Sequence, residues 1–168
     1  MELSEHPLFG RLTEEELGRL EDLVQERDLV PAEALFREGA EGDDFYLLLE
    51  GQVRLSCTRP DGGQERLGLL KPGAVLGVTG LESTRPSTAA AMGPTRVMVI
   101  PGSALHGTPR TADGRLALGL REIVALAQNY QLRSANRQLA VMAQQLRDEP
   151  DTDAWTDVGT QGGWVSDE

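Results

Sequence analysis

Few side chains in this sequence have the chemistry that catalysis or metal binding requires. His6 and His106 lie at opposite ends of the predicted domain, so neither pairs with the other or with Cys57 as nucleophile and base. His106 is expected to be exposed and Cys57 to be a small core residue. One cysteine and two histidines match no recognised metal-ligand spacing and are too few for a haem or iron–sulfur centre. The sequence therefore predicts neither an enzyme nor a metalloprotein.

The charge balance of the chain limits its partners. The formal net charge is −11 over 168 residues, and Lys71 is the only lysine. An excess of acidic groups repels phosphate backbones and anionic lipid surfaces, so we expect no nucleic-acid partner and no membrane partner. The first residues lack the basic and apolar regions of a secretory signal. No apolar run approaches the roughly 18 residues that a membrane span needs. We expect a cytoplasmic protein.

A short helix is predicted over residues 12–27. Thr13 and Glu16 have the spacing of a capping box, in which hydroxyl and carboxylate satisfy the free N–H groups at a helix start. Apolar residues at helical spacing follow on one face: Leu17, Leu20, Leu23 and Val24.

From residue 28 to residue 100 the pattern changes to short β-favouring runs separated by Gly- and Pro-rich breaks. These runs are 28–30, 34–36, 44–51, 52–57, 64–70, 74–78, 87–92 and 95–100. Strands of this length at this spacing predict an all-β sandwich or barrel. Gly51 is expected to turn one hairpin and residues 61–63 another. We therefore assign residues 1–112 to one domain, a β-barrel preceded by a helix.

A long helix is predicted over residues 113–147, with Asp113 as its N-cap. An apolar residue recurs at every seventh position: Leu118, Ala125, Leu132, Leu139 and Leu146. This repeat is typical of a coiled-coil seam and indicates a homodimer formed through the helix. A second apolar stripe covers another face: Leu116, Leu120, Ile123, Ala127 and Tyr130. One stripe can pack on the barrel and the other on a second copy. The alternative is a single helix folded back on the barrel.

The last segment, residues 148–168, is acidic and glycine-rich and is expected to be flexible by itself. It contains both tryptophans of the chain, Trp155 and Trp164. Tryptophans in such a segment are candidate anchors for a groove on an unidentified protein partner. The alternative is that both rings dock on the protein's own barrel.

The order of these elements resembles the cyclic-nucleotide-binding domain shared by catabolite activator proteins, kinase regulatory subunits and cyclic-nucleotide-gated channels. The segments that carry the resemblance are HPLFGRLTEEEL (6–17), GDDFYLLLEGQVRL (42–55), LLKPGAVLG (69–77) and TRVMVIPGSAL (95–105). The resemblance implies a mainly β fold with flanking helices. Its expected form is a jelly-roll β-barrel followed by the long C-terminal helix.

The phosphate-binding cassette is where this sequence departs from the family pattern. In ligand-binding members a helix N-terminus and an arginine hold the cyclic phosphate, and a glutamate accepts the ribose hydroxyl. Here the resemblance places the glutamate position on Val78 and the arginine position on Pro86. Arg85, one residue earlier, is the candidate phosphate ligand, and the alternative is an arginine exposed in a loop. The candidate ligand-binding residues are Gly77, Val78, Arg85, Ser87 and Thr88.

These departures lead to two function hypotheses from different classes. The first is a non-catalytic regulatory module that acts through protein–protein contacts, with weak or lost binding of cAMP and cGMP and no bound cofactor. It would not bind DNA, since no helix-turn-helix pattern follows the long helix. It includes a regulatory subunit of a separately encoded enzyme or motor. The alternative is a sensor of a cyclic nucleotide or cyclic dinucleotide, whose ligand state repositions the C-terminal helix.

Overall fold

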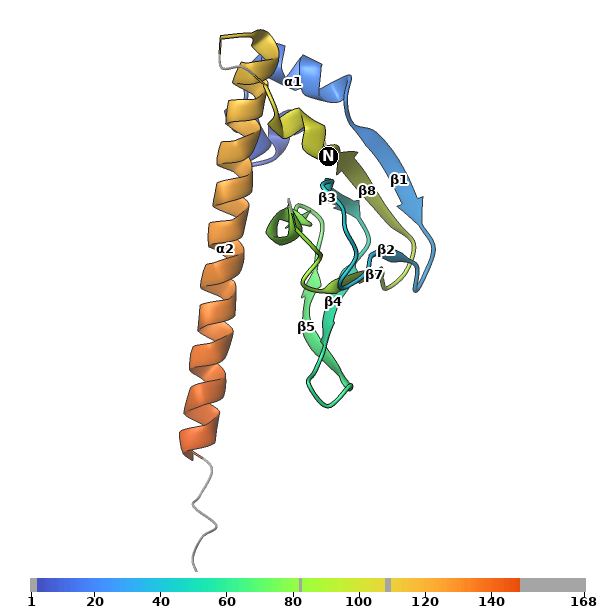
Figure 1. Ribbon diagram of the computed structural model, residues 1–168, viewed down its shortest axis with the longest axis vertical. Coiled ribbons are helices and arrows are strands. Elements are labelled where there is room, and N and C mark those ends of the chain that lie inside the picture. The colour runs from blue at the N-terminus through green and yellow to red at the C-terminus, as the bar shows by residue number, and fades with distance from the viewer. Residues whose placement is uncertain (1–2, 82, 108–109, 149–168) are drawn as a thin grey trace, which may run out of the picture. The chain divides into compact units, whose positions relative to one another are not determined.

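The computed structural model describes residues 3–81, 83–107 and 110–148. The chain forms two compact units, residues 1–131 and residues 132–168. Over the described residues the helices are η1 Leu3–Glu5, η2 Phe9–Arg11, α1 Glu14–Glu21, η3 Val78–Gly80, η4 Gly102–Leu105 and α2 Ala112–Asp148 (Figure 1). Helix α2 begins in the first unit and continues into the second. Within the described ranges, none of the helices is both long and apolar enough to cross a membrane.

Two antiparallel sheets of four strands each make up the body of the first unit, counted over the described residues. One sheet has the order β1-β8-β3-β6 and the other the order β2-β7-β4-β5. The strands are β1 Gln25–Leu29, β2 Ala34–Phe36, β3 Phe45–Glu50, β4 Val53–Thr58, β5 Gln64–Leu70, β6 Val75–Leu76, β7 Thr88–Ala91 and β8 Thr95–Ile100. Each predicted run overlaps one of them, and the predicted jelly-roll barrel with a long C-terminal helix is confirmed.

The N-terminal helix α1 keeps the predicted capping box but is shorter than predicted. The Thr13 hydroxyl accepts the backbone N–H of Glu16 at 3.3 Å, and the Glu16 carboxylate accepts the backbone N–H of Thr13 at 2.8 Å. The helix ends at Glu21, so the predicted span of 12–27 is wrong at its C-terminal end. Residues 25–29 instead pair with the central strand β8. Strand pairing within a sheet outweighs the weak helical preference of this segment.

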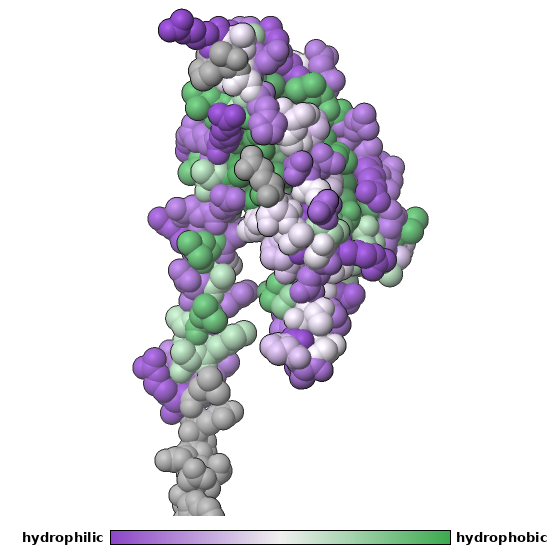
Figure 2. Space-filling model, in the orientation of Figure 1, coloured by the Kyte–Doolittle hydropathy of each residue, from purple (hydrophilic) through white to green (hydrophobic). Residues whose placement is uncertain are grey.

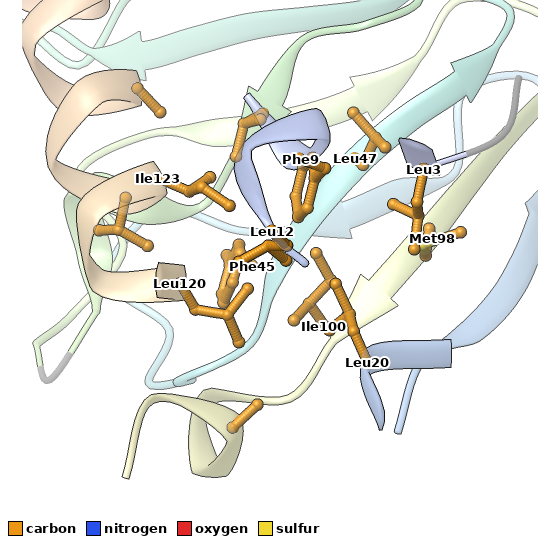
Figure 3. Packing of buried hydrophobic residues seen from close by; sticks show 14 of the residues in the cluster. Leu3, Phe9, Leu12, Leu20, Phe45, Leu47, Met98, Ile100, Leu120 and Ile123 are labelled. Atoms are coloured by element: carbon orange, nitrogen blue, oxygen red, sulfur yellow. The ribbon is translucent and has the colours of Figure 1, made fainter. Parts of the chain in front are cut away.

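Two clusters of buried side chains form the core of the first unit. One lies between the first sheet, the N-terminal turns and α2 (Figure 3), and it includes Phe9, Leu12, Leu20, Phe45, Leu47, Ile100, Leu120 and Ile123. The other draws its side chains from both sheets and includes Leu35, Leu48, Val53, Ala89 and Val97. Helix α2 is therefore packed into the same cluster as the first sheet.

The predicted second stripe of α2 is the face that packs on the barrel. Leu116, Leu120, Ile123 and Ala127 are each no more than 5% exposed. Tyr130 is 70% exposed, so its assignment to this stripe is wrong. The contact with the barrel at this turn is instead a hydrogen bond from the Gln131 side chain to the carbonyl of Val75. Leu23, predicted on the apolar stripe of the first helix, lies beyond the end of α1 and is 45% exposed.

The predicted heptad seam lies on a different face of α2 and outside the core. Leu118, Leu132 and Leu139 are 60%, 62% and 63% exposed, and Ala125 is exposed as well. The side chain of Leu146 lies outside the described residues. In the second unit, hydrophobic side chains lie exposed along the described helix among polar ones (Figure 2), and they include Val141 and Met142. This face is available to another chain, and the dimer stays a prediction.

The two faces of α2 predict opposite responses to truncation. Leu120→Ala should lower the free energy of unfolding by about 2–5 kcal/mol, because it removes a fully buried side chain and leaves a cavity. The matched change is Leu118→Ala, two residues earlier on the exposed face of the helix. It should lower the free energy of unfolding by less than about 0.5 kcal/mol. Urea unfolding followed by circular dichroism at low protein concentration measures both. Equal losses from the two variants would contradict the assignment of the faces.

Candidate ligand site

The loop that follows strand β6 contains the first part of the predicted cassette. Gly77 has a φ of +81°, a left-handed conformation that favours glycine. A Cβ at this position would lie 2.9 Å from Nη1 of Arg85 and 3.1 Å from the carbonyl oxygen of Asp44. Gly77 is therefore required both for the turn of the backbone and for the close approach of Arg85. The short helix η3 starts at the next residue.

Arg85 is buried beside this loop, with only 2% of its surface exposed. Its Nη1 donates to the carbonyl oxygen of Gly77 at 2.6 Å, and its Nη2 donates to that of Asp44 at 2.6 Å. The guanidinium carbon lies 4.9 Å from the centroid of the Phe36 ring, over its face. The alternative reading of Arg85 as an exposed loop arginine is wrong. Its backbone is paired on both sides with residues 39–40, which draws the loop onto the barrel.

The charge of Arg85 has no carboxylate partner among the described residues. The ion pairs of these residues all involve other, largely exposed arginines. A buried charge is costly unless it is paired or hydrogen-bonded, and here two carbonyl oxygens and one aromatic face supply the compensation. The position retains the chemistry needed to attract an anion.

Tyr46 completes a small stack of planar groups beside the same loop. Its ring lies 5.9 Å from the ring of Phe36, with the two planes 25° apart. Burial raises the pKa of the Tyr46 phenol above its ordinary value, and the positive charge of Arg85 opposes part of that rise. The phenol therefore reports on the charge of Arg85.

Val78 occupies the position where the resemblance places the ribose-binding glutamate. It is fully buried and belongs to the core cluster that includes α2. Its carbonyl oxygen accepts a hydrogen bond of 2.8 Å from Nε2 of Gln128, and the carbonyl of Val75 accepts one of 2.9 Å from Nε2 of Gln131. Two glutamines of α2 therefore bond to the backbone on either side of Gly77. The sequence analysis did not predict this role of Gln128 and Gln131. The one sequence feature that points to it is that both residues lie within one helical turn of Ala127, the last residue of the buried stripe of α2.

The remaining predicted pocket residues, Ser87 and Thr88, lie at the start of β7. Ser87 is buried, while Thr88 is partly buried. The Thr88 hydroxyl accepts the backbone N–H of Glu38 at 3.0 Å, and the Glu38 carboxylate accepts the backbone N–H and the hydroxyl of Thr58. The hydroxyl of Thr88 is thus used in joining segments of the barrel. Among the five predicted residues, a side-chain hydrogen bond joins Arg85 to Gly77.

The other candidate residues have structural surroundings. His6 is buried; its Nδ1 accepts the backbone N–H of Leu8 at 3.2 Å, and its Nε2 lies 2.9 Å from the carbonyl of Gly73. Because Nδ1 accepts, Nε2 is the nitrogen that donates to that carbonyl. His106 is exposed, as expected. Cys57 is partly buried, so its placement in the core is only partly right. Among the described residues, no three His, Cys, Asp or Glu side chains gather as a metal site would require.

The fold and the loop define a class of protein, a jelly-roll binding domain with an arginine buried beside the loop after β6. The family model of the cyclic nucleotide-binding domain matches residues 26–111, just over half of the chain. The chain belongs to the cyclic nucleotide-binding domain family, which the sequence resemblance predicted. The matched model describes a binding domain of regulatory proteins rather than a catalytic domain.

Relatives of known description cover part of this chain. It is 33% identical over 95 residues to a cAMP-dependent protein kinase regulatory subunit of Mycosarcoma maydis, covering 55% of this chain and 18% of that protein. It is 32% identical over 96 residues to a cyclic AMP receptor protein of Thermus thermophilus, covering 56% of this chain and 44% of that protein. The match therefore spans less than half the length of either relative.

A solved structure agrees with the fold over a longer stretch. The cyclic nucleotide-binding domain from Methylobacillus flagellatus aligns with a TM-score of 0.73, covering 83% of this chain and 79% of that chain. Its sequence identity of 21% makes this likeness one of fold alone.

The contact between Arg85 and the aromatic stack predicts a shift in the titration of Tyr46. Replacing Arg85 with Gln should raise the pKa of the Tyr46 phenol further, because the positive charge that favours the phenolate is removed. Ultraviolet titration in a Tyr130→Phe background, which leaves Tyr46 as the only tyrosine, measures it. Arg115→Gln removes the same charge from an exposed arginine that is not among the groups acting on Tyr46, and it is the matched control. An unchanged or lower pKa in the folded Gln variant would contradict the stated electrostatic contact.

Proposed function

We propose that this chain is a non-catalytic regulatory module that acts through protein–protein contacts and binds cAMP and cGMP weakly or not at all. The observation that carries the proposal is the burial of Val78 in the core, at the position of the family's ribose-binding glutamate. An aliphatic side chain there offers no acceptor to a ribose hydroxyl.

The expected loss of affinity follows from one missing hydrogen bond. A hydrogen bond to a charged group contributes about 1.5–3 kcal/mol, which is about 10- to 150-fold in affinity. Arg85 adds to the loss, because at least two of its N–H groups already donate to the carbonyls of Gly77 and Asp44. A cyclic phosphate would have to use the remaining donors or displace these bonds.

The contacts between the cassette and α2 support a regulatory role for the helix. Gln128 and Gln131 connect α2 to the backbone of Val78 and Val75. A partner or ligand that binds one arrangement of the loop better than another would shift the equilibrium between the corresponding helix positions. The free energy of that shift equals the difference in binding free energy. The helix would be the element through which this module acts.

Calorimetric titration with cAMP, cGMP and cyclic di-GMP tests the weak-binding part of the proposal. We expect no binding as tight as about 1 µM, since a lost ribose contact and an occupied arginine each weaken the complex. Binding of cAMP or cGMP at that level or tighter would overturn it, and binding of cyclic di-GMP would favour the second candidate function described below.

The proposal includes a homodimer formed through the exposed face of α2. The side chains of Leu118, Leu132 and Leu139 are more than half exposed at a seven-residue spacing, which is the repeat of a left-handed coiled coil. A second apolar face of the helix, formed by Leu116, Leu120, Ile123 and Ala127, is already buried on the barrel. The helix can therefore contact the barrel and a second copy with different faces.

The dimer is tested by changing the seam without changing the helix. The double variant Leu132→Glu with Leu139→Glu should convert a dimer into a single chain of 18.2 kDa, because it places carboxylates within an apolar seam. The matched control is Val141→Glu, an equally exposed apolar position that is off the seven-residue repeat. Analytical ultracentrifugation measures the mass. A monomeric parent protein, or dissociation by the control as well, would contradict the seam.

A second candidate function is favoured by the burial of Arg85 without a carboxylate partner. In this alternative the chain senses an anion, such as a cyclic nucleotide or cyclic dinucleotide, at that guanidinium. Binding in the titration above that is lost in Arg85→Gln and kept in Arg85→Lys would favour it. The predicted partner-docking residues Trp155 and Trp164 lie outside the described residues, so their role stays a prediction.

A further inference from the structure

A cleft lies beside the cassette but apart from Arg85. It has a volume of about 390 Å³, which falls in the range of small-molecule sites. The cleft is formed by the residue after η3, the end of η4 and one face of α2. Its lining residues are Leu81, Leu105, His106, Arg121, Val124 and Gln128.

The lining has two parts with different chemistry. Leu81, Leu105 and Val124 supply aliphatic surface, while Arg121 and His106 supply polar N–H donors. Arg121 forms no ion pair with any described residue, and the described lining includes no acidic side chain. The cleft therefore presents an unneutralised guanidinium next to an apolar wall, in a chain whose net charge is −11.

We propose that this cleft binds a small organic carboxylate with an apolar body. A guanidinium matches a carboxylate through two parallel hydrogen bonds, and the aliphatic wall takes the rest of the ligand out of water. The site is separate from the candidate phosphate ligand, because Arg85 is turned to the carbonyls of Gly77 and Asp44 and does not line the cleft.

Binding here would act on the position of α2. Gln128 lines the cleft and also donates to the carbonyl of Val78 in the cassette. A ligand that contacts both the helix, at Arg121 and Val124, and the cassette, at Leu81, favours the arrangement in which helix and cassette lie together. The cleft is thus a regulatory site that does not depend on a nucleotide.

Calorimetry with 2-naphthoate as the probe tests the site. We expect binding in the full-length protein, and binding at least about 10-fold weaker for the neutral 2-naphthamide, which is the factor that about 1.4 kcal/mol corresponds to. Addition of cAMP at about 1 mM should leave naphthoate binding unchanged. No naphthoate binding up to about 5 mM, equal affinity for the amide, or displacement by cAMP would overturn the proposal.

Two arginine variants on one helix separate a specific site from a general charge effect. Arg121→Gln should weaken naphthoate binding by about 10-fold or more, because the carboxylate loses its bidentate partner. Arg115→Gln removes the same charge from an exposed arginine that pairs with Glu15 and does not line the cleft, and should leave binding unchanged. Both positions are exposed, so both variants should keep the parent's melting temperature. Equal binding by the two variants would place the probe elsewhere and overturn the site.

Discussion

The guanidinium of Arg85 connects three segments that are far apart in the sequence. It donates to the carbonyls of Gly77 and Asp44 and covers the ring of Phe36. This arrangement requires small residues around it, since a Cβ at Gly42 would lie 3.1 Å from Nη2. The loop after β6, the start of β3 and the end of β2 are therefore held at a fixed separation by one side chain. The shape of the cassette depends on that contact.

Helix α2 is joined to the same loop as Arg85 through hydrogen bonds of its own. Its aliphatic face is buried with the first sheet, and the side chains of Gln128 and Gln131 bond backbone carbonyls on both sides of Gly77. Apolar packing is tolerant of small slides, whereas hydrogen bonds to two carbonyls fix the register of the helix on the loop. These two hydrogen bonds couple the loop to the helix, and that coupling is the physical basis of the regulation through α2 that we propose.

Local features of the sequence were sufficient to predict most of the fold. The capping box at Thr13 and the strands β5 and β8 follow from patterns within a few residues, because side-chain alternation and turn chemistry are local. The end of α1 at Glu21 was missed, since pairing with β8 decides it. The burial of Arg85 was also missed, because its carbonyl and aromatic partners come from distant segments. At the sequence level, a position before proline simply indicated a loop.

The two ligand contacts that the family resemblance implies fall on residues with different chemistry in this chain, Arg85 and Val78. A phosphate is held by positive charge and N–H donors, and Arg85 keeps such a charge in a buried position. A ribose hydroxyl needs a hydrogen-bond acceptor, and the side chain at that position is instead the aliphatic Val78, which is part of the core. Val78 contributes to the packing of the core, whereas a glutamate there would have to remain solvated or paired. The proposed weak binding of cAMP and cGMP therefore rests on Val78, and the alternative of an anion sensor rests on the buried charge of Arg85.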